Sequence, residues 1–116
     1  FFKKKISFTN KVKKFFSNKN LEHLIITRGA KNLIHIDKKR KFFYKIKKIK
    51  IFDVTGASDT FIALLSLNIF KKENIKKSIM LATLGATNVV QKQFTSKITK
   101  QEYSKLKKIL RKKNLN

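Results

Sequence analysis

The segment Asp53-Val54-Thr55-Gly56-Ala57-Ser58-Asp59-Thr60 combines the residue types that phosphoryl chemistry requires. It joins a stretch predicted to be a strand to an apolar stretch predicted to be a helix. Gly56 allows a tight turn, and the amides of Gly56, Ala57, Ser58 and Asp59 are then unpaired donors at a helix N-terminus, which binds anions. Asp59 could take a proton from a hydroxyl while those amides hold a phosphoryl group. The segment predicts phosphoryl transfer to an alcohol, although Ser58 or Asp59 taken alone is more often a helix cap.

The chain before this segment is predicted to contain a helix and then strands. Residues 1–8 fit a short strand or a frayed end, and Thr9 is the candidate N-cap of a helix that ends near residues 18–20. The run from His23 to Thr27 is apolar at successive positions, which is typical of a strand buried on both faces, as in a parallel sheet. Residues 28–32 form a predicted turn that leads into a second strand.

The second strand, Leu33 to Asp37, is predicted to pair with the first as a hairpin. Residues 38–41 form a predicted charged turn. The period-two pattern of residues 42–51 then predicts one or two half-exposed strands.

The chain after the segment is predicted to be helical. Thr60 to Phe70 is apolar nearly all round, which favours a buried helix. Residues 75–91 predict a second helix with Asn74 as its N-cap, and residues 99–102 form a capping box that opens a last helix. Residues 111–116 read as a solvated tail. Strands followed by helices, joined through a glycine turn, indicate the α/β class.

Length and composition exclude several classes of protein. The 116 residues fit one domain or a piece of one, and the first residue, Phe1, hints at a piece. The absence of cysteine excludes disulfides, thiolate zinc sites and a cysteine nucleophile. The longest apolar run, residues 61–70, is too short to span a membrane, and a cytoplasmic location is the default expectation.

The net charge of +24 has two interpretations. Lys, Ile, Asn and Phe, which A/T-rich codons encode, make up 61 of the 116 residues, so mutational drift could have placed lysine at every tolerant surface position. The alternative is binding to nucleic acid or to another polyanion. Only 3 of the 30 basic residues are arginine and the lysines are spread along the chain, so no specific nucleic-acid interface is predicted.

The segment at residues 53–59 resembles the Asp-x-x-Gly-Ala-Gly-Asp signature of the ribokinase-like (PfkB) carbohydrate kinases. Two further stretches support the resemblance: His23 to Arg28 is similar to a family strand that ends in Thr-Arg, and residues 89–96 to Val-Val-Gly-Lys-Leu-Gly-Thr-Ser. The similarity is strongest to the kinase region of bifunctional enzymes that act on heptose 7-phosphate, a precursor of the lipopolysaccharide core. It implies the C-terminal half of a three-layer, Rossmann-like kinase domain over residues 1–116.

The resemblance implies roles for the residues of the signature. Asp59 matches the catalytic base that deprotonates the sugar hydroxyl. Gly56, Ala57 and Ser58 match the anion hole for the transferring phosphoryl group. Asp53 matches a position that helps to bind a monovalent cation such as K⁺, with a turn-forming aspartate as the alternative. ATP and Mg²⁺ are the implied cofactors.

Three residues outside the signature match nucleotide-binding positions of the family. Thr27 and Gly29 match the Thr-x-Gly start of a segment beside the nucleotide phosphates, and an ordinary hairpin turn is the alternative. Thr83 falls where the family lines its adenine pocket. Lys92 is expected to be solvated rather than bound to nucleotide.

The chain also departs from the family pattern. Ser58 and Asn32 replace glycines, and a side chain at position 58 is expected to restrict φ and crowd the reacting groups, so slower chemistry is expected. Further glycines are replaced at Gln91 and Phe94. The N-terminal half with most of the sugar contacts, and any adenylyltransferase region, are not matched. A partner that supplies that half, a homodimer, another kinase of the family, and a non-catalytic remnant that binds polyanions all stay open.

Overall fold

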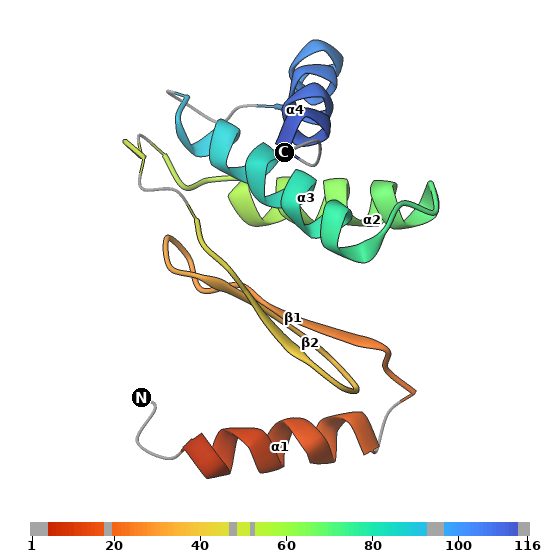
Figure 1. The fold of residues 1–116 in the computed structure, drawn as a ribbon. Coiled ribbons are helices and arrows are strands. Elements are labelled where there is room, and N and C mark those ends of the chain that lie inside the picture. The colour runs from red at the N-terminus through yellow and green to blue at the C-terminus, as the bar shows by residue number, and fades with distance from the viewer. Residues whose placement is uncertain (1–4, 18–19, 47–48, 52, 93–96, 114–116) are drawn as a thin grey trace. The chain divides into compact units, whose positions relative to one another are not determined.

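The structure, a computed structural model, describes residues 5–17, 20–46, 49–51, 53–92 and 97–113 (Figure 1). It divides into two compact units, residues 1–46 and residues 47–116. The first holds helix α1 and strands β1 to β3, and the second holds helices α2 to α4. The expectations for residues 1–4, Phe94 and residues 114–116 lie outside the described residues.

Helix α1, Lys5–Ser17, begins before the predicted cap. Thr9 lies inside the helix and residues 5–8 are helical, so the cap at Thr9 and the strand or frayed end at residues 5–8 were wrong predictions. No proline or glycine precedes Ser17, and nothing in that sequence stops the helix from extending toward the N-terminus. Val12 and Phe16 are half-buried, whereas Phe15 is exposed.

Strands β1 (His23–Ile26), β2 (Leu33–Asp37) and β3 (Lys41–Tyr44) form one antiparallel sheet in the order β1-β2-β3. His23 pairs with Asp37, and Leu33 pairs with Tyr44. The central strand β2 is buried from Leu33 to Ile36, whereas β1 is an edge strand that is at most half-buried. The predicted hairpin is confirmed, but the prediction of a doubly buried strand of a parallel sheet at residues 23–27 was wrong.

The lengths of the connections explain this result. A parallel pair of strands needs a crossover of a dozen or more residues, and the links after β1 and β2 are much shorter. An apolar run by itself does not distinguish an edge strand from a central one. Residues 42–51 give only β3, because residues 45–46 and 49–51 are not in a strand.

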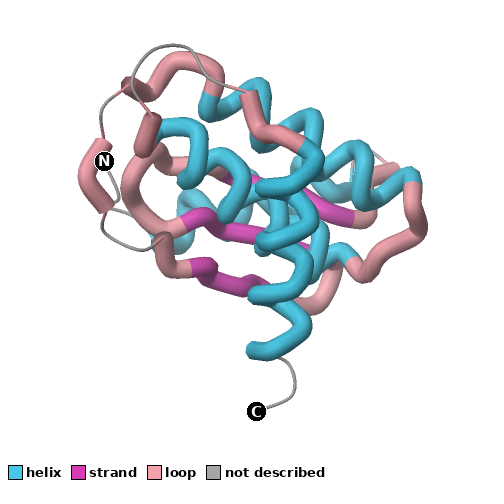
Figure 2. The backbone as a smooth tube through the Cα atoms, turned by 90° about the horizontal axis from the view of Figure 1, so that it is seen from above, coloured by secondary structure: helices cyan, strands magenta, loops and turns pink. Residues whose placement is uncertain are grey.

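Helices α2 (Ala57–Phe70), α3 (Ile75–Val90) and α4 (Lys100–Lys113) form the second unit. Figure 2 shows the backbone with its helices in cyan and its strands in magenta. α3 packs against both α2 and α4. Gly85 allows the close approach of α3 to α2, because a Cβ atom there would lie 2.1 Å from Cδ1 of Leu64. Leu81, Leu106 and Leu110 form the core between α3 and α4.

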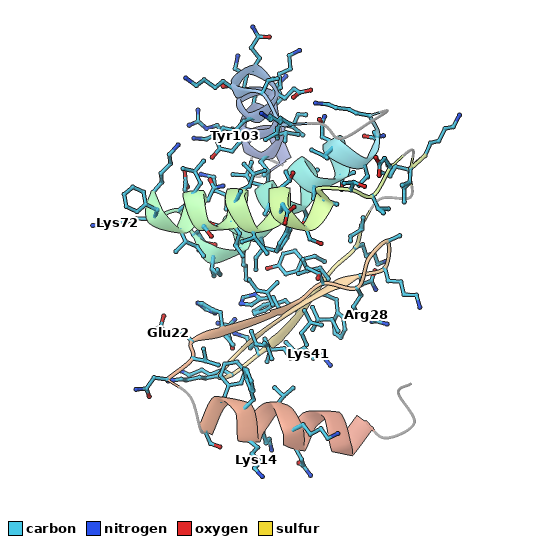
Figure 3. The ribbon with its side chains drawn as sticks, turned by 180° about the vertical axis from the view of Figure 1, so that it is seen from behind. Lys14, Glu22, Arg28, Lys41, Lys72 and Tyr103 are labelled. Atoms are coloured by element: carbon cyan, nitrogen blue, oxygen red, sulfur yellow. The ribbon has the colours of Figure 1, made fainter. Side chains whose placement is uncertain are left out.

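Polar contacts fix the helix ends and join α4 to α2. Asn74 caps α3 as predicted, because its side chain accepts a hydrogen bond from the Lys76 amide at 2.9 Å. Tyr103 on α4 is labelled in Figure 3. Its hydroxyl donates to Oδ1 of the fully buried Asn68 on α2 at 2.8 Å. Residues 111–113 continue α4, so the predicted tail is partly helical.

The helices and the antiparallel sheet agree with the predicted α/β class. α2 differs from the prediction, because it begins at Ala57 and only one of its sides is buried. In the described part of the chain, no helix has the length and apolar character needed to cross a membrane.

Candidate functional site

The predicted corner between coil and helix is present at the start of α2. Gly56 is the N-cap residue, with φ 78° and ψ −2°, a left-handed conformation that favours glycine. The Thr60 amide donates to the Gly56 carbonyl at 2.9 Å, which closes the first turn of the helix. No side chain caps the helix. The first turn therefore presents bare backbone donors.

Three backbone amides at this corner lack an acceptor within the described residues, namely those of Gly56, Ser58 and Asp59. The fourth predicted donor is different. The amide of Ala57 donates to the carbonyl of Val54 at 3.2 Å, so the prediction of four free amides was wrong at that residue. A tight turn before the helix uses the first amide after the glycine to close itself. The remaining amides and the helix dipole favour an anion.

Asp59 lies in the first turn of α2 and is exposed. Its side chain makes no hydrogen bond or ion pair with any described residue, although the chain has 30 basic residues. Asp37, Asp53, Glu73 and Glu102 all accept hydrogen bonds from backbone or side-chain donors. Asp59 is not a cap, so its carboxylate is available to a ligand at the same turn.

Asp53 forms a turn of its own. Its Oδ1 accepts a hydrogen bond from the Thr55 amide at 2.8 Å. Hydrogen bonds from the backbone and the side chain of Thr55 lower the pKa of this carboxyl group below its ordinary value. The Asp53 amide also donates to the Val90 carbonyl at 3.5 Å, which ties the corner to the end of α3. The turn-forming alternative is therefore observed for this residue.

Ser58 occupies an ordinary position in the first turn of α2, and its backbone is not left-handed. The left-handed conformation is at Gly56, so the expected restriction of φ at position 58 does not arise. Ser58 is exposed. Its hydroxyl makes no hydrogen bond within the described part of the chain, and it stands beside the free amides.

Thr27 and Gly29 follow β1 in the first unit, whereas the corner belongs to the second. The Lys31 amide donates to the Arg28 carbonyl at 3.1 Å, and Gly29 within this turn has φ 59°. Asn32 does not have a positive φ. Thr27 and Gly29 are both exposed, so the turn is accessible to a ligand. The same turn joins β1 to β2, as the alternative of an ordinary hairpin turn predicts.

Thr83 and Lys92 have partners within the second unit. The hydroxyl of Thr83 donates to the Ile79 carbonyl one turn earlier in α3, at 2.8 Å. The Lys92 ammonium lies 2.7 Å from Oε1 of Glu102 and donates to the Lys97 carbonyl at 3.0 Å. Lys92 is therefore neither simply solvated nor free for a nucleotide. No local sequence pattern predicts the contact between Lys92 and Glu102, because ten residues separate the two charges.

Comparison with known proteins identifies the family of this chain. Residues 1–101 match the profile of the pfkB family carbohydrate kinase. The bifunctional protein HldE of Campylobacter curvus (strain 525.92) is 38% identical over 73 residues, which are 63% of this chain and 15% of that protein. This chain therefore spans a small part of the curated relative.

Two solved kinases share the fold. Arabidopsis thaliana ribokinase, complexed with ribose and ATP, matches with a TM-score of 0.74 at 18% identity, over 90% of this chain and 34% of that one. Escherichia coli phosphofructokinase-2, in complex with potassium, matches with a TM-score of 0.74 at 10% identity, over 92% and 35%. Because the family profile covers most of the 116 residues, the chain belongs to the pfkB family of carbohydrate kinases.

Proposed function

We propose that this chain supplies the catalytic base and the anion hole of an ATP-dependent sugar kinase. The hydroxyl oxygen of the sugar attacks the γ-phosphorus of ATP, the bond to the β–γ bridging oxygen breaks, and ADP leaves. Asp59 accepts the hydroxyl proton, and the amides at the start of α2 stabilise the charge on the phosphoryl oxygens. The proposed acceptor is D-glycero-β-D-manno-heptose 7-phosphate, which the similarity to HldE supports.

The single observation that carries this proposal is the juxtaposition at the first turn of α2. Free amides of Gly56 and Ser58 stand beside the unpaired carboxylate of Asp59. A helix N-terminus alone would favour any anion. The negative charge of a carboxylate at this position opposes the binding of an anion. Among the described residues Asp59 has no capping or ion-pair role that would explain its presence. A role as a base would explain it. The chemistry that uses both groups is transfer of a phosphoryl group to a hydroxyl.

ATP, Mg²⁺ and K⁺ are the proposed cofactors. Mg²⁺ would enter with the ATP phosphates, because it keeps several of its waters and binds few protein ligands. Asp53 fits a K⁺ role in part: Oδ1 accepts from the Thr55 amide, and the lowered pKa keeps the carboxylate negatively charged. Thr27 and Gly29 are proposed to lie beside the nucleotide phosphates. Thr83 is proposed to line the adenine pocket with its methyl group, because its hydroxyl is bound within α3.

The activity is proposed to need more of the kinase domain than this chain holds, because the chain covers about a third of the solved kinases. A polypeptide with the N-terminal half, or a homodimer partner, would supply the sugar contacts. Positioning accounts for a large share of the rate of such reactions. The complete kinase is proposed to act in the cytoplasm, where ATP and sugar phosphates are available.

The experiment coexpresses this chain with the N-terminal part of the kinase region of Campylobacter curvus HldE and measures ADP formation with heptose 7-phosphate. Asp59→Asn should lower the rate by about 10² to 10⁴. Glu22→Gln is the matched control, because Glu22 is also an exposed acid without a partner among the described residues. Equal rates for wild type and Asp59→Asn would remove Asp59 as the base.

The identity of the sugar is tested in the same assay. Heptose 7-phosphate should give a higher kcat/KM than ribose, fructose 6-phosphate or adenosine. A preference for one of these other acceptors would keep the kinase proposal and replace the substrate by that of another family member.

The charge of the chain supports a second candidate, non-catalytic binding to polyanions. The first unit has a cavity of about 390 Å³ beside Val12, Phe16 and Ile36. Its basic lining consists of Lys13, Lys38, Lys39, Arg40 and Lys41. Binding of a random RNA or of polyphosphate that weakens steeply with salt, without stabilisation of the chain by ATP, would favour this candidate.

A further inference from the structure

The cavity of the first unit is apolar on one part of its lining. It has a volume of about 390 Å³ and lies against α1, β2 and the turn that follows β2. Val12 and Phe16 are four residues apart on α1, so they share one face of that helix. Both are half-buried, and Ile36 of β2 is 8% exposed. An apolar cavity of this size with a few polar groups at its edge has the form of a small-ligand pocket.

The rest of the lining is basic. Lys13 comes from α1, and Lys38 and Lys39 come from the turn between β2 and β3. All three are exposed, and none makes an ion pair with a residue that the structure describes. Lys41 is the register partner of Ile36, so the basic and apolar parts of the lining adjoin across the sheet. Positive side chains at the edge of a cavity raise the local concentration of anions.

Asp37 is the only acid of the lining, and the turn uses it. Its Oδ1 accepts hydrogen bonds from the amides of Lys39, at 2.7 Å, and Arg40. The Asp37 amide in turn donates to the Arg40 carbonyl at 2.9 Å. The turn that carries the lysines is therefore closed by its own hydrogen bonds before any ligand binds, which lowers the entropic cost of binding.

The two parts of the lining select the chemistry of the ligand. A polyanion or an inorganic anion would pair with the lysines but would leave the apolar part in contact with water. A neutral apolar molecule would fill the cavity but would not use the lysines. A ligand that uses both parts has an apolar body and one anionic head group.

We propose that this cavity binds an amphipathic anion, an acyl or aryl chain that ends in a carboxylate or a phosphate ester. The chain lies against Val12, Phe16 and Ile36, and the head group pairs with Lys38 and Lys39. The site belongs to the first unit, whereas the phosphate corner of α2 belongs to the second. The proposal therefore goes beyond the kinase function and does not depend on it.

The test is a ¹H–¹⁵N NMR titration of the chain with decanoate, kept below the concentration at which it forms micelles. Saturable shifts are expected at the amides of residues 12–16 and 36–41. Decanol and acetate each have only half of the required chemistry, so each should bind at least about tenfold more weakly than decanoate. Decyl phosphate tests the head group: tighter binding of either amphiphile keeps the proposal and selects between carboxylate and phosphate.

A pair of double variants tests the lysines. Lys38→Gln with Lys39→Gln should weaken decanoate binding by about tenfold, because both partners of the head group are lost. Lys105→Gln with Lys108→Gln is the matched control at two exposed lysines of α4. Both double variants lower the net charge by the same amount, so a difference between them reports the position of the lysines. The control should leave the affinity unchanged.

Two neighbouring phenylalanines of α1 test the apolar part. Phe16 lines the cavity, whereas Phe15 does not and is 45% exposed. Phe16→Ser should weaken decanoate binding by about tenfold, and Phe15→Ser should have no effect. Circular dichroism checks the fold of each variant. If Phe16→Ser unfolds the first unit, the exposed lysine pair still decides the proposal.

Four results would overturn the proposal. These are the absence of saturable shifts at residues 36–41, binding of acetate or inorganic phosphate as tight as that of decanoate, equal losses in the two lysine pairs, and competition of Mg·ATP with decanoate. The last three would indicate binding driven by net charge alone. The kinase function fails separately: if decanoate binds as expected but the assembled kinase makes no ADP, the cavity site stands and the catalytic proposal does not.

Discussion

The N-termini of α2 and α4 each carry an acidic residue in the first turn, but the two acids have different surroundings. In α4 the Thr99 amide donates to Oε2 of Glu102 at 2.8 Å, and the Glu102 amide donates to Oγ1 of Thr99 at 3.2 Å. In α2 the N-cap is Gly56, no side chain accepts from the first turn, and Asp59 has no partner among the described residues.

The difference separates a helix end that serves stability from one that is open to a ligand. α4 satisfies its donors with its own capping box and adds the Lys92 ion pair to Glu102. α2 leaves donors and carboxylate unused, which lowers the stability of the helix end by the absent cap.

The largest effect is expected on catalysis, when the two acids are removed in turn. In the complex with the N-terminal kinase segment, Asp59→Asn should lower kcat by about 10² to 10⁴. Glu102→Gln should leave kcat unchanged, because this side chain is engaged with Thr99 and Lys92. The measurement is single-turnover ADP release. Similar losses of kcat in both variants would contradict a specific catalytic role for Asp59 in the first turn of α2.

Gly56→Ala should destabilise the fold by about 1–2 kcal/mol, because alanine is strained at φ 78°. Apart from the adjoining residues 55 and 57, no described residue has an atom within 4 Å of the added Cβ, so the expected cost is in the backbone. Gly29→Ala, at φ 59°, should show a similar loss in urea unfolding. A larger loss at position 56 alone would indicate contacts there that the structure does not contain.

Removal of the hydroxyl at each helix end should distinguish the cap from the uncapped end. Thr99→Ala should lower the free energy of unfolding by about 1 kcal/mol, since it removes the N-cap of α4. Ser58→Ala should change it by less than about 0.5 kcal/mol, because the Ser58 hydroxyl caps nothing. Thermal unfolding of both variants provides the measurement, and equal losses would contradict the contrast between the two ends.

The smallest effect is expected on how the free energy of unfolding changes with pH under acidic conditions. The hydrogen bond from Lys92, with help from the Thr99 amide, lowers the pKa of Glu102 from 4.5 to about 2. Because the folded-state pKa is depressed, this stabilisation is complete above about pH 4.5 and is lost as the pH falls toward 2. For a partly exposed pair it amounts to about 1 kcal/mol or less. Glu102→Gln should reduce the change in the free energy of unfolding with pH over that range. If the pH dependence is the same as in the wild type, the Glu102 carboxyl group is not its cause.

Local chemistry in the sequence predicted the helix ends better than the sheet. Asn74, Thr99 and Glu102 were identified because a cap needs only residues two or three positions apart. β1 was misjudged because an apolar run does not reveal how many neighbours a strand has. Thr9 was misjudged because no breaker precedes it.

The tight turn at Gly56 before a helix was predicted from the residue types, and the structure adds that Gly56 is left-handed. The closure of the Ala57 amide onto Val54 depends on the turn geometry, and the contact of Asp53 with Val90 joins residues far apart in sequence. Neither leaves a local pattern. The exposed side of α2 was also missed, because apolarity all round predicts burial without naming what provides it.

The most direct measurement is a ¹H–¹⁵N NMR titration of the chain with Mg·ATP. The account predicts the largest amide shifts at Gly56, Ser58 and Asp59, with no comparable change at the capped start of α4, Lys100 to Glu102. Shifts that are spread over the lysine-rich surface, or that are equal at the two helix ends, would contradict the claim that α2 opens on a phosphate site.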